Sequence, residues 1–152
     1  MNPLRFVPVA KAMAELSRDP STKVGAVVID SDANILSTAF NGFPRGVIDS
    51  QERYAQREIK LSLTAHAEAN AIAQAARTGA KLFGSTLIVT ALYPCSNCAK
   101  LIIQSGIKKV YAPKMDATQS NQQWFFEKEI AELLFLESGI EVIEYELSLI
   151  HI

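Results

Sequence analysis

The stretch T-L-I-V-T-A-L-Y-P-C-S-N-C-A-K-L-I-I-Q-S-G-I-K-K-V-Y-A, residues 86–112, decides the expected fold. The apolar runs 86–91 and 109–112 are typical of short strands that are covered on both faces. Between them, 96–105 is predicted to be a helix, and Gly106 follows as its stop. A strand, a helix and a second strand in this order predict two parallel strands joined by a right-handed crossover.

The rest of the chain continues this alternation. Apolar residues at three-to-four spacing predict helices, and short apolar runs between turn residues predict strands. The further predicted elements are a helix at 3–16, strands at 24–29 and 35–40, helices at 65–78 and 122–137, and a strand at 140–145. The polar segment 49–63 is expected to be a loop with a helical portion. The order α-β-β-α-β-α-β-α-β predicts an α/β fold whose first hairpin supplies an antiparallel edge.

Length and charge narrow the function classes. The chain has 152 residues, 49% of them apolar, and is predicted to form a single domain over 1–152. Its net charge is −1 and its Lys and Arg residues are scattered, which disfavours a nucleic-acid partner. The longest apolar runs are strand-length, and the opening M-N-P-L-R-F-V lacks the layout of a signal peptide. We therefore expect a cytoplasmic protein without a membrane segment.

Cys95 and Cys98, in P-C-S-N-C, are the two cysteines of the chain. This spacing fits a metal pair, a thioredoxin-like redox pair, or two small core residues. The segment T-A-H-A-E-A-N adds His66 and Glu68, which stand two positions apart. On the side of a helix they would point in nearly opposite directions, so they can serve one site only at a helix end.

Both motifs fall at predicted helix starts. His66 follows Thr64, a candidate N-cap, and Cys95 opens the next helix. Helix N-termini carry partial positive charge, which favours thiolates at Cys95 and Cys98. One imidazole and two thiolates leave one coordination position open, as in catalytic zinc sites. We predict that these three residues bind Zn²⁺, whereas His151, beside the end of the sequence, is not expected to join them.

Glu68 is the candidate acid–base group. Two thiolates neutralise the charge of zinc, so a water at this metal is less acidic than at a three-histidine site and benefits from a neighbouring base. A glutamate in the first turn of a helix also stabilises the helix dipole, which is the structural alternative. Beside His66 and the cysteine pair, we interpret Glu68 as catalytic.

The segments H-A-E and P-C-S-N-C together have the form H-x-E…P-C-x-x-C, the signature of zinc nucleobase deaminases. Within that superfamily the chain resembles the deoxycytidylate (dCMP) deaminase family. The matching segments, from about Leu16 to Ala112, are S-R-D-P-S-T-K-V-G-A-V-V-I, F-N-G-F-P-R-G-V, H-A-E-A-N-A-I and Y-P-C-S-N-C-A-K-L-I-I-Q-S-G-I-K-K-V. The resemblance implies a cytidine-deaminase-like fold, a three-layer α-β-α sandwich with a mixed, roughly five-stranded sheet.

The resemblance also implies a reaction, the hydrolysis of dCMP to dUMP and ammonia, which supplies dUMP for thymidylate synthesis. Glu68 would take a proton from water, protonate N3 and help the amine leave. Backbone groups at Ala67 would hold the carbonyl of the base. Asn41 matches the asparagine that holds the sugar, although an Asn-Gly pair is also typical of a plain turn.

The phosphate contacts have no motif of their own. No P-loop is present, so backbone N–H groups, hydroxyls and a few cations would have to hold a monophosphate. Ser21, Thr22 and Lys23 are the first candidates, with Arg45 and Lys114 behind them.

Regulation, assembly and the exact substrate stay open at this point. Ala39-Phe40 replaces the Gly-Tyr of many members, which weakens the expectation of dCTP and dTTP as allosteric ligands. Trp124 could line the pocket or belong to the core. The resemblance suggests a homo-oligomer, commonly a hexamer. The alternatives are a deaminase of another cytosine base, nucleoside or nucleotide (5-modified dCMP and dCTP included), a nucleic-acid deaminase, and a zinc module without activity.

Overall fold

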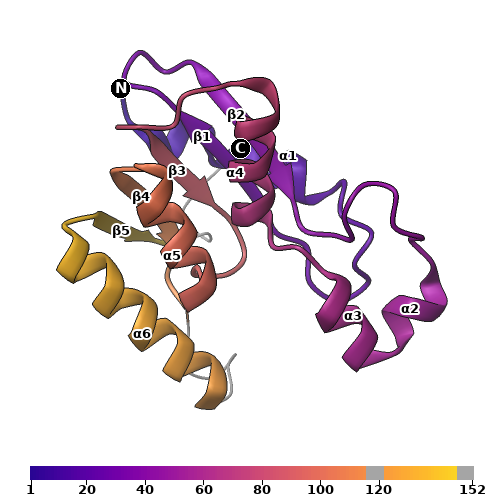
Figure 1. Cartoon of the computed structure of the whole chain (residues 1–152). Helices are drawn as coiled ribbons and strands as arrows, with labels where there is room; N and C mark the ends of the chain where they lie inside the picture. Colours follow the sequence, from indigo (N-terminus) through magenta and orange to yellow (C-terminus); the bar gives the residue numbers. More distant parts are fainter. Residues whose placement is uncertain (116–121, 147–152) are drawn as a thin grey trace.

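The computed structural model describes residues 1–115 and 122–146 (Figure 1). Its elements in chain order are η1 (Pro3–Phe6), α1 (Val7–Ala14), β1 (Gly25–Ile29), β2 (Ile35–Phe40), α2 (Gln51–Ala55), α3 (Arg57–Leu63), α4 (Ala67–Thr78), β3 (Thr86–Val89), α5 (Ser96–Ser105), β4 (Lys109–Pro113), α6 (Gln122–Ser138) and β5 (Glu141–Tyr145). No helix within the described ranges is long and apolar enough to cross a membrane.

The strands form one mixed sheet in the order β2-β1-β3-β4-β5. β1 runs antiparallel to both β2 and β3, whereas β3, β4 and β5 are parallel. The parallel half arises because α5 connects β3 to β4 and α6 connects β4 to β5, each helix returning the chain to the same end of the sheet. The predicted α/β fold is confirmed, with the first hairpin at the antiparallel edge.

Helices cover both faces of the sheet. Val27 and Ile88 belong to the core that η1 and α1 cover, and Val28 and Leu87 belong to the core on the opposite face, with residues of α4, α5 and α6. Because side chains alternate between faces along a strand, all five residues of β1 are buried. The predicted three-layer α-β-α sandwich is therefore present.

Gly25 allows α1 to lie directly on the sheet. A Cβ atom at this position would stand 1.8 Å from the carbonyl oxygen of Ala10 and 2.7 Å from the backbone nitrogen of Ala14. Both neighbours are helix backbone, which cannot move aside without breaking α1. The glycine of the V-G-A-V-V segment is thus required by close packing of a helix on a strand.

Two predicted boundaries differ from the structure. The third strand ends at Val89 and not at Ala91, because Ala91 has a left-handed backbone (φ 70°) that cannot continue a strand. The predicted N-cap at Thr64 is wrong. Thr64 instead ends α3, where its hydroxyl donates to the carbonyl of Lys60 at 2.6 Å, and the N-cap of α4 is His66.

The predicted helix stops are confirmed. Gly79 and Gly106 have left-handed backbones (φ 82° and 86°) at the C-caps of α4 and α5. The polar segment 49–63 contains the two short helices α2 and α3, which project to one side of the body (Figure 1).

Candidate metal centre and active site

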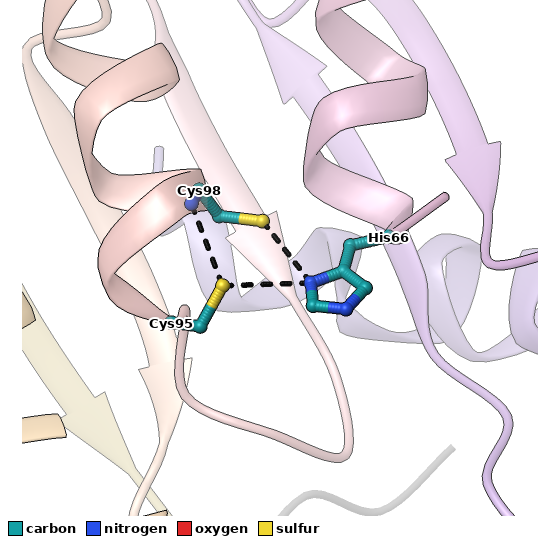
Figure 2. Close-up of side chains that lie close together, drawn as sticks. All are labelled: His66, Cys95 and Cys98. Carbon is teal, nitrogen blue, oxygen red and sulfur yellow. Dashed lines mark hydrogen bonds between the residues drawn. The ribbon is translucent and has the colours of Figure 1, made fainter. Parts of the chain in front are cut away.

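Three side chains from two helix ends converge on one point. The Sγ atoms of Cys95 and Cys98 lie 3.5 and 3.4 Å from Nδ1 of His66. The three donor atoms all lie within 4.8 Å of one another, and both sulfur atoms face the imidazole ring (Figure 2). Across residues 1–115 and 122–146, no other set of three or more His, Cys, Asp or Glu donors has this spacing. The structure therefore brings together the three residues predicted to bind zinc.

Each ligand belongs to the first turn of a helix. His66 is the N-cap of α4, with an extended backbone (φ −72°, ψ 153°), and Cys95 is the N-cap of α5. The backbone N–H of Cys98 donates to Sγ of Cys95 at 3.5 Å, so the sulfur atom itself caps the helix. N–H groups at a helix start favour negative charge, which stabilises thiolates at this point.

Contacts within the triad make the two thiols unequal. A hydrogen bond with Cys98 is the main cause that lowers the pKa of the Cys95 thiol to about 4; burial opposes this change, and a hydrogen bond with His66 supports it. The hydrogen bond with Cys95, together with burial, raises the pKa of Cys98. These contacts therefore favour a thiolate at Cys95 over a thiolate at Cys98.

The donor set fits zinc. An imidazole nitrogen and two sulfur atoms are common zinc ligands, and both cysteines are free thiols here. The group contains no fourth His, Cys, Asp or Glu donor from the described part of the chain. Three protein ligands leave one position for water or substrate, which is the arrangement of catalytic zinc.

Glu68 lies in the first turn of α4 beside this triad and is only 5% exposed. Burial is the main influence on its carboxyl group and raises its pKa, although hydrogen bonds with backbone and with Cys98 act in the opposite direction. A buried carboxyl group with a raised pKa next to a metal-binding triad is suited to accept and release a proton.

Asn41 is buried directly after β2, and backbone groups hold its amide. Its Oδ1 accepts from the N–H of Val24 at 2.9 Å, and its Nδ2 donates to the carbonyl of Thr22 at 2.9 Å. A primary amide has two N–H donors. Within the described residues the Asn41 amide donates one hydrogen bond, to Thr22, so its second N–H can serve a ligand. The next residue, Gly42, pairs with Ala65, which immediately precedes the ligand His66.

The first phosphate candidates lie in the loop between α1 and β1. Ser21 and Lys23 are exposed, and Thr22 is half-buried. A cation that sequence reasoning did not find joins this loop, because Nζ of Lys60 in α3 lies 2.6 Å from Oγ of Ser21. No local pattern links two residues so far apart in the chain, so the contact could not be predicted.

The other candidates have partners of their own. Arg45 donates to Oε1 of Gln74 at 2.7 Å, and Lys114 forms an exposed ion pair with Glu146 at 3.7 Å. Trp124 packs against the core between the sheet and its helices, which supports the core alternative. His151 lies outside the described residues.

Two further side chains support the site without any recognisable motif. Oε1 of Glu127 in α6 accepts from the N–H of Ser96 at 3.2 Å and from its hydroxyl at 2.7 Å, immediately after the ligand Cys95. Nδ2 of Asn70 in α4 donates to the carbonyl of Phe40 at 2.8 Å, next to Asn41. Glu127 thus joins α6 to the start of α5, and Asn70 joins the end of β2 to α4.

A three-layer α-β-α sandwich with a His-Cys-Cys triad at two helix N-termini and a glutamate beside the histidine defines a zinc-dependent deaminase. Residues 2–114 match the family described as the cytidine and deoxycytidylate deaminase zinc-binding region. The chain belongs to this family.

Relatives and solved structures agree with the family. The chain is 42% identical over 138 residues to an uncharacterized deaminase in the luxG 3′ region of Aliivibrio fischeri, covering 91% of this chain and 89% of that protein. It is 41% identical over 113 residues to deoxycytidylate deaminase of Homo sapiens, covering 71% of this chain but only 62% of the human protein. The dCMP deaminase of cyanophage S-TIM5, solved in complex with dCMP and dUMP, aligns with a TM-score of 0.74 and 26% identity over 95% of this chain and 99% of that chain.

Proposed function

We propose that the protein catalyses the zinc-dependent hydrolysis of dCMP to dUMP and ammonia. The observation that carries the proposal is the convergence of His66, Cys95 and Cys98 beside the buried carboxyl group of Glu68. The relatives named for dCMP, one of them solved with dCMP and dUMP, favour a cytosine mononucleotide over a free base or a polymer.

The chain's own residues divide the chemistry between them. Zinc held by the triad would lower the pKa of a water molecule. Glu68 would take a proton from a water molecule beside it and pass it to N3 of the cytosine. It would then transfer the remaining proton of that water to the 4-amino group as the C4–N bond breaks and ammonia leaves. The oxygen of the water replaces the amino nitrogen at C4. Because Glu68 is buried, the protons it carries are not exchanged freely with bulk water.

Substrate contacts surround this centre. Ala67 is the fully buried first residue of α4, and an N–H at this position has no partner within a helix, so it can hold the carbonyl of the base. The free N–H of Asn41 would meet a sugar hydroxyl. The phosphate would lie against the loop that carries Ser21, Thr22 and Lys23. The N–H groups of Ser21 and Thr22 and the hydroxyl of Ser21 already donate to Asp19, so the Thr22 hydroxyl and the Lys23 cation are the first donors for the phosphate.

The test is a substrate panel with the purified, zinc-loaded protein, in which release of ammonia is measured for cytosine, deoxycytidine, dCMP, 5-methyl-dCMP and dCTP. We expect dCMP to have the highest kcat/KM, exceeding deoxycytidine by about 10²-fold, because two or more charge-assisted hydrogen bonds contribute about 1.5–3 kcal/mol each. Equal efficiency for deoxycytidine or cytosine contradicts the nucleotide assignment. Adding dCTP or dTTP to the dCMP assay tests allosteric control.

We also propose that the protein is a cytoplasmic homo-oligomer. α6 exposes three large apolar side chains, Phe126 (55%), Leu133 (48%) and Leu136 (78%). Leu133 and Leu136 also border a cavity of about 530 Å³ between α6 and β5. Exposed apolar area of this kind on one helix favours association. Analytical ultracentrifugation of the parent and of Leu136→Glu measures the association. We expect Leu136→Glu to associate less than the parent, and a monomeric parent contradicts the proposed homo-oligomer.

A further inference from the structure

Lys60 of α3 forms a shielded ion pair with the loop that precedes β1. Its Nζ atom lies 2.9 Å from Oδ1 of Asp19, and the two side chains are only 17% and 4% exposed. The same Oδ1 atom accepts from the N–H and the hydroxyl of Ser21 and from the N–H of Thr22, at 2.9, 3.1 and 3.0 Å. Because the pair is shielded, water and salt screen it far less than an exposed pair.

This cluster continues without a break to Asn41. The carbonyl of Thr22 and the N–H of Val24 bind the two ends of the Asn41 amide. The hydroxyl of Ser17 donates to the backbone carbonyl of Asn41 at 2.9 Å and accepts from the N–H of Asp19 at 3.3 Å. The direction in which the Asn41 amide points is therefore set by the 17–24 segment, and Asp19 organises that segment.

The helix that carries Lys60 leads directly into the segment that carries the metal ligand His66. α3 ends at Leu63 with Thr64 as its C-cap, and the next residue, Ala65, exchanges two backbone hydrogen bonds with Gly42, at 2.8 and 3.1 Å. α3 thus contacts the loop that orients Asn41 through Lys60, and Gly42, which follows Asn41, is paired with Ala65 just beyond the end of α3. Figure 1 shows that α2 and α3 project from the body. The segment 49–63 also meets the region after Asn41 through α2, where the buried ring of Tyr54 stacks on Phe43 with 4.3 Å between the ring centroids.

We propose that Lys60 is a positioning residue whose ion pair with Asp19 holds the 17–24 segment and, through it, the Asn41 amide that meets the sugar. The proposal rests on the proposed function, because it requires a cytosine nucleoside or nucleotide at Asn41. A direct contact of Lys60 with the phosphate is a different role with a different consequence. A positioning residue affects every ligand that has the sugar, whereas a phosphate contact affects only ligands that have the phosphate.

Lys60→Met tests the proposal, because methionine retains an unbranched apolar stem and loses the charge. We expect KM to rise about tenfold for deoxycytidine, which corresponds to 1.4 kcal/mol, and at least as much for dCMP, because the same segment carries the phosphate candidates Ser21, Thr22 and Lys23. The kcat value should change by less than about threefold, because the zinc ligands and Glu68 are untouched. Lys60→Arg retains the charge and should recover most of the loss, and Asp19→Asn should reproduce the effect of Lys60→Met.

Binding of dUMP and of deoxyuridine, measured by isothermal titration calorimetry, repeats the comparison without turnover and applies even where deoxycytidine reacts slowly. Lys109→Met is the matched control, because Lys109 pairs with Glu141 with both side chains exposed (37% and 63%). Zinc content and melting temperature are measured for every variant, and Lys60→Arg and Asp19→Asn carry the test if Lys60→Met does not fold.

An effect confined to dCMP and dUMP contradicts the positioning role of Lys60 and indicates a phosphate contact. Unchanged KM and Kd values for the ligands with and without the phosphate contradict the positioning role altogether. If the parent protein prefers deoxycytidine to dCMP, the proposed function fails while the positioning test still runs on deoxycytidine. If the parent prefers dCMP and Lys60→Met behaves like the parent, the positioning role fails alone.

Discussion

Nδ1 of His66 lies 3.4 Å from Sγ of Cys98, although 32 positions separate the two residues in the chain. The contact exists because α4 and α5 begin at one place, each presenting its first turn to the other (Figure 2). Each helix contributes ligands that are insufficient alone: α4 provides one imidazole, and α5 provides two thiols. The metal centre therefore forms only when the starts of α4 and α5 pack together in the folded chain.

The first prediction follows from the ligand count. His66→Ala, Cys95→Ala or Cys98→Ala should each reduce bound zinc well below one ion per chain, because two protein ligands hold zinc much more weakly than three. Zinc is measured by inductively coupled plasma mass spectrometry after dialysis against a mild chelator. His151→Ala, which changes a histidine that is not expected to bind the metal, should retain its zinc. Parent-level zinc in all three ligand variants would exclude this site.

The second prediction separates proton transfer from metal binding. Glu68→Gln should retain zinc, because Glu68 is not one of the three donors. Its kcat for dCMP should nevertheless fall by about 10²-fold or more, the usual contribution of a positioned acid–base group. Ammonia release and zinc content are measured on the same sample. A Glu68→Gln protein that turns over at the parent rate would leave Glu68 the structural role of a residue in the first turn of a helix.

The third prediction concerns Asn41, whose amide has structural partners as well as a free donor. Asn41→Ala leaves the N–H of Val24 and the carbonyl of Thr22 without partners, so the free energy of unfolding should fall by about 1–3 kcal/mol. The kcat/KM for dCMP should fall by a further factor of about 10 or more if the amide also binds the sugar. Urea unfolding and steady-state kinetics measure the two effects separately.

Asn34→Ala is the control for Asn41→Ala, because Asn34 is exposed in the turn between β1 and β2. A protein with Asn41→Ala that loses stability but retains its kcat/KM would make Asn41 a residue of the fold alone.

Local sequence patterns were sufficient for most of the fold. The apolar run at 86–91 and the helix stop at Gly106 depend on neighbouring residues, and both predicted elements are present. The strand nevertheless ends early, because the left-handed backbone at Ala91 depends on the course of the loop that leads to Cys95. Periodicity does not encode such a backbone turn at an alanine.

The triad could be predicted because its residues form short motifs with a known chemical requirement. The supporting contacts could not, because an ion pair such as Lys60 with Asp19 joins two ordinary surface-type residues only after the chain has folded. At Thr64 the local pattern predicted the wrong role. A threonine two positions before His66 fits an N-cap locally, yet its hydroxyl is used by the end of α3.

The fourth prediction concerns acid stability. Burial tends to raise the pKa of the Asp19 carboxyl group, but hydrogen bonds from Lys60, Ser21 and Thr22 outweigh burial and lower it. A carboxyl group whose pKa is lower in the folded chain stabilises the fold at pH values above its unfolded pKa, about 3.9, and this contribution is lost as the pH falls through the folded pKa. Parent and Lys60→Met should therefore differ most in melting temperature at neutral pH. The difference should narrow as the pH falls through the lowered folded pKa of Asp19, because a protonated Asp19 no longer carries the charge that Lys60 balances. A constant difference from neutral to acid pH would show that the ion pair is not its source.

The last prediction concerns Glu127, which reaches from α6 to the first turn of α5. Its Oε1 atom holds both the N–H and the hydroxyl of Ser96, directly after the ligand Cys95. Glu127→Ala should release zinc to a competing chelator about tenfold more readily, the lower end of the effect of removing a residue that orients metal ligands. Glu127 also places an acidic side chain at the start of α5, so Glu127→Ala changes the charge there as well as the hydrogen bonds. Glu127→Gln separates the two effects, because it retains an acceptor oxygen and removes the charge. We expect Glu127→Gln to hold zinc nearly as well as the parent, and Glu129→Ala, on an exposed position of the same helix, to match the parent. Tighter zinc binding in Glu127→Ala would mean that charge outweighs orientation at this helix start.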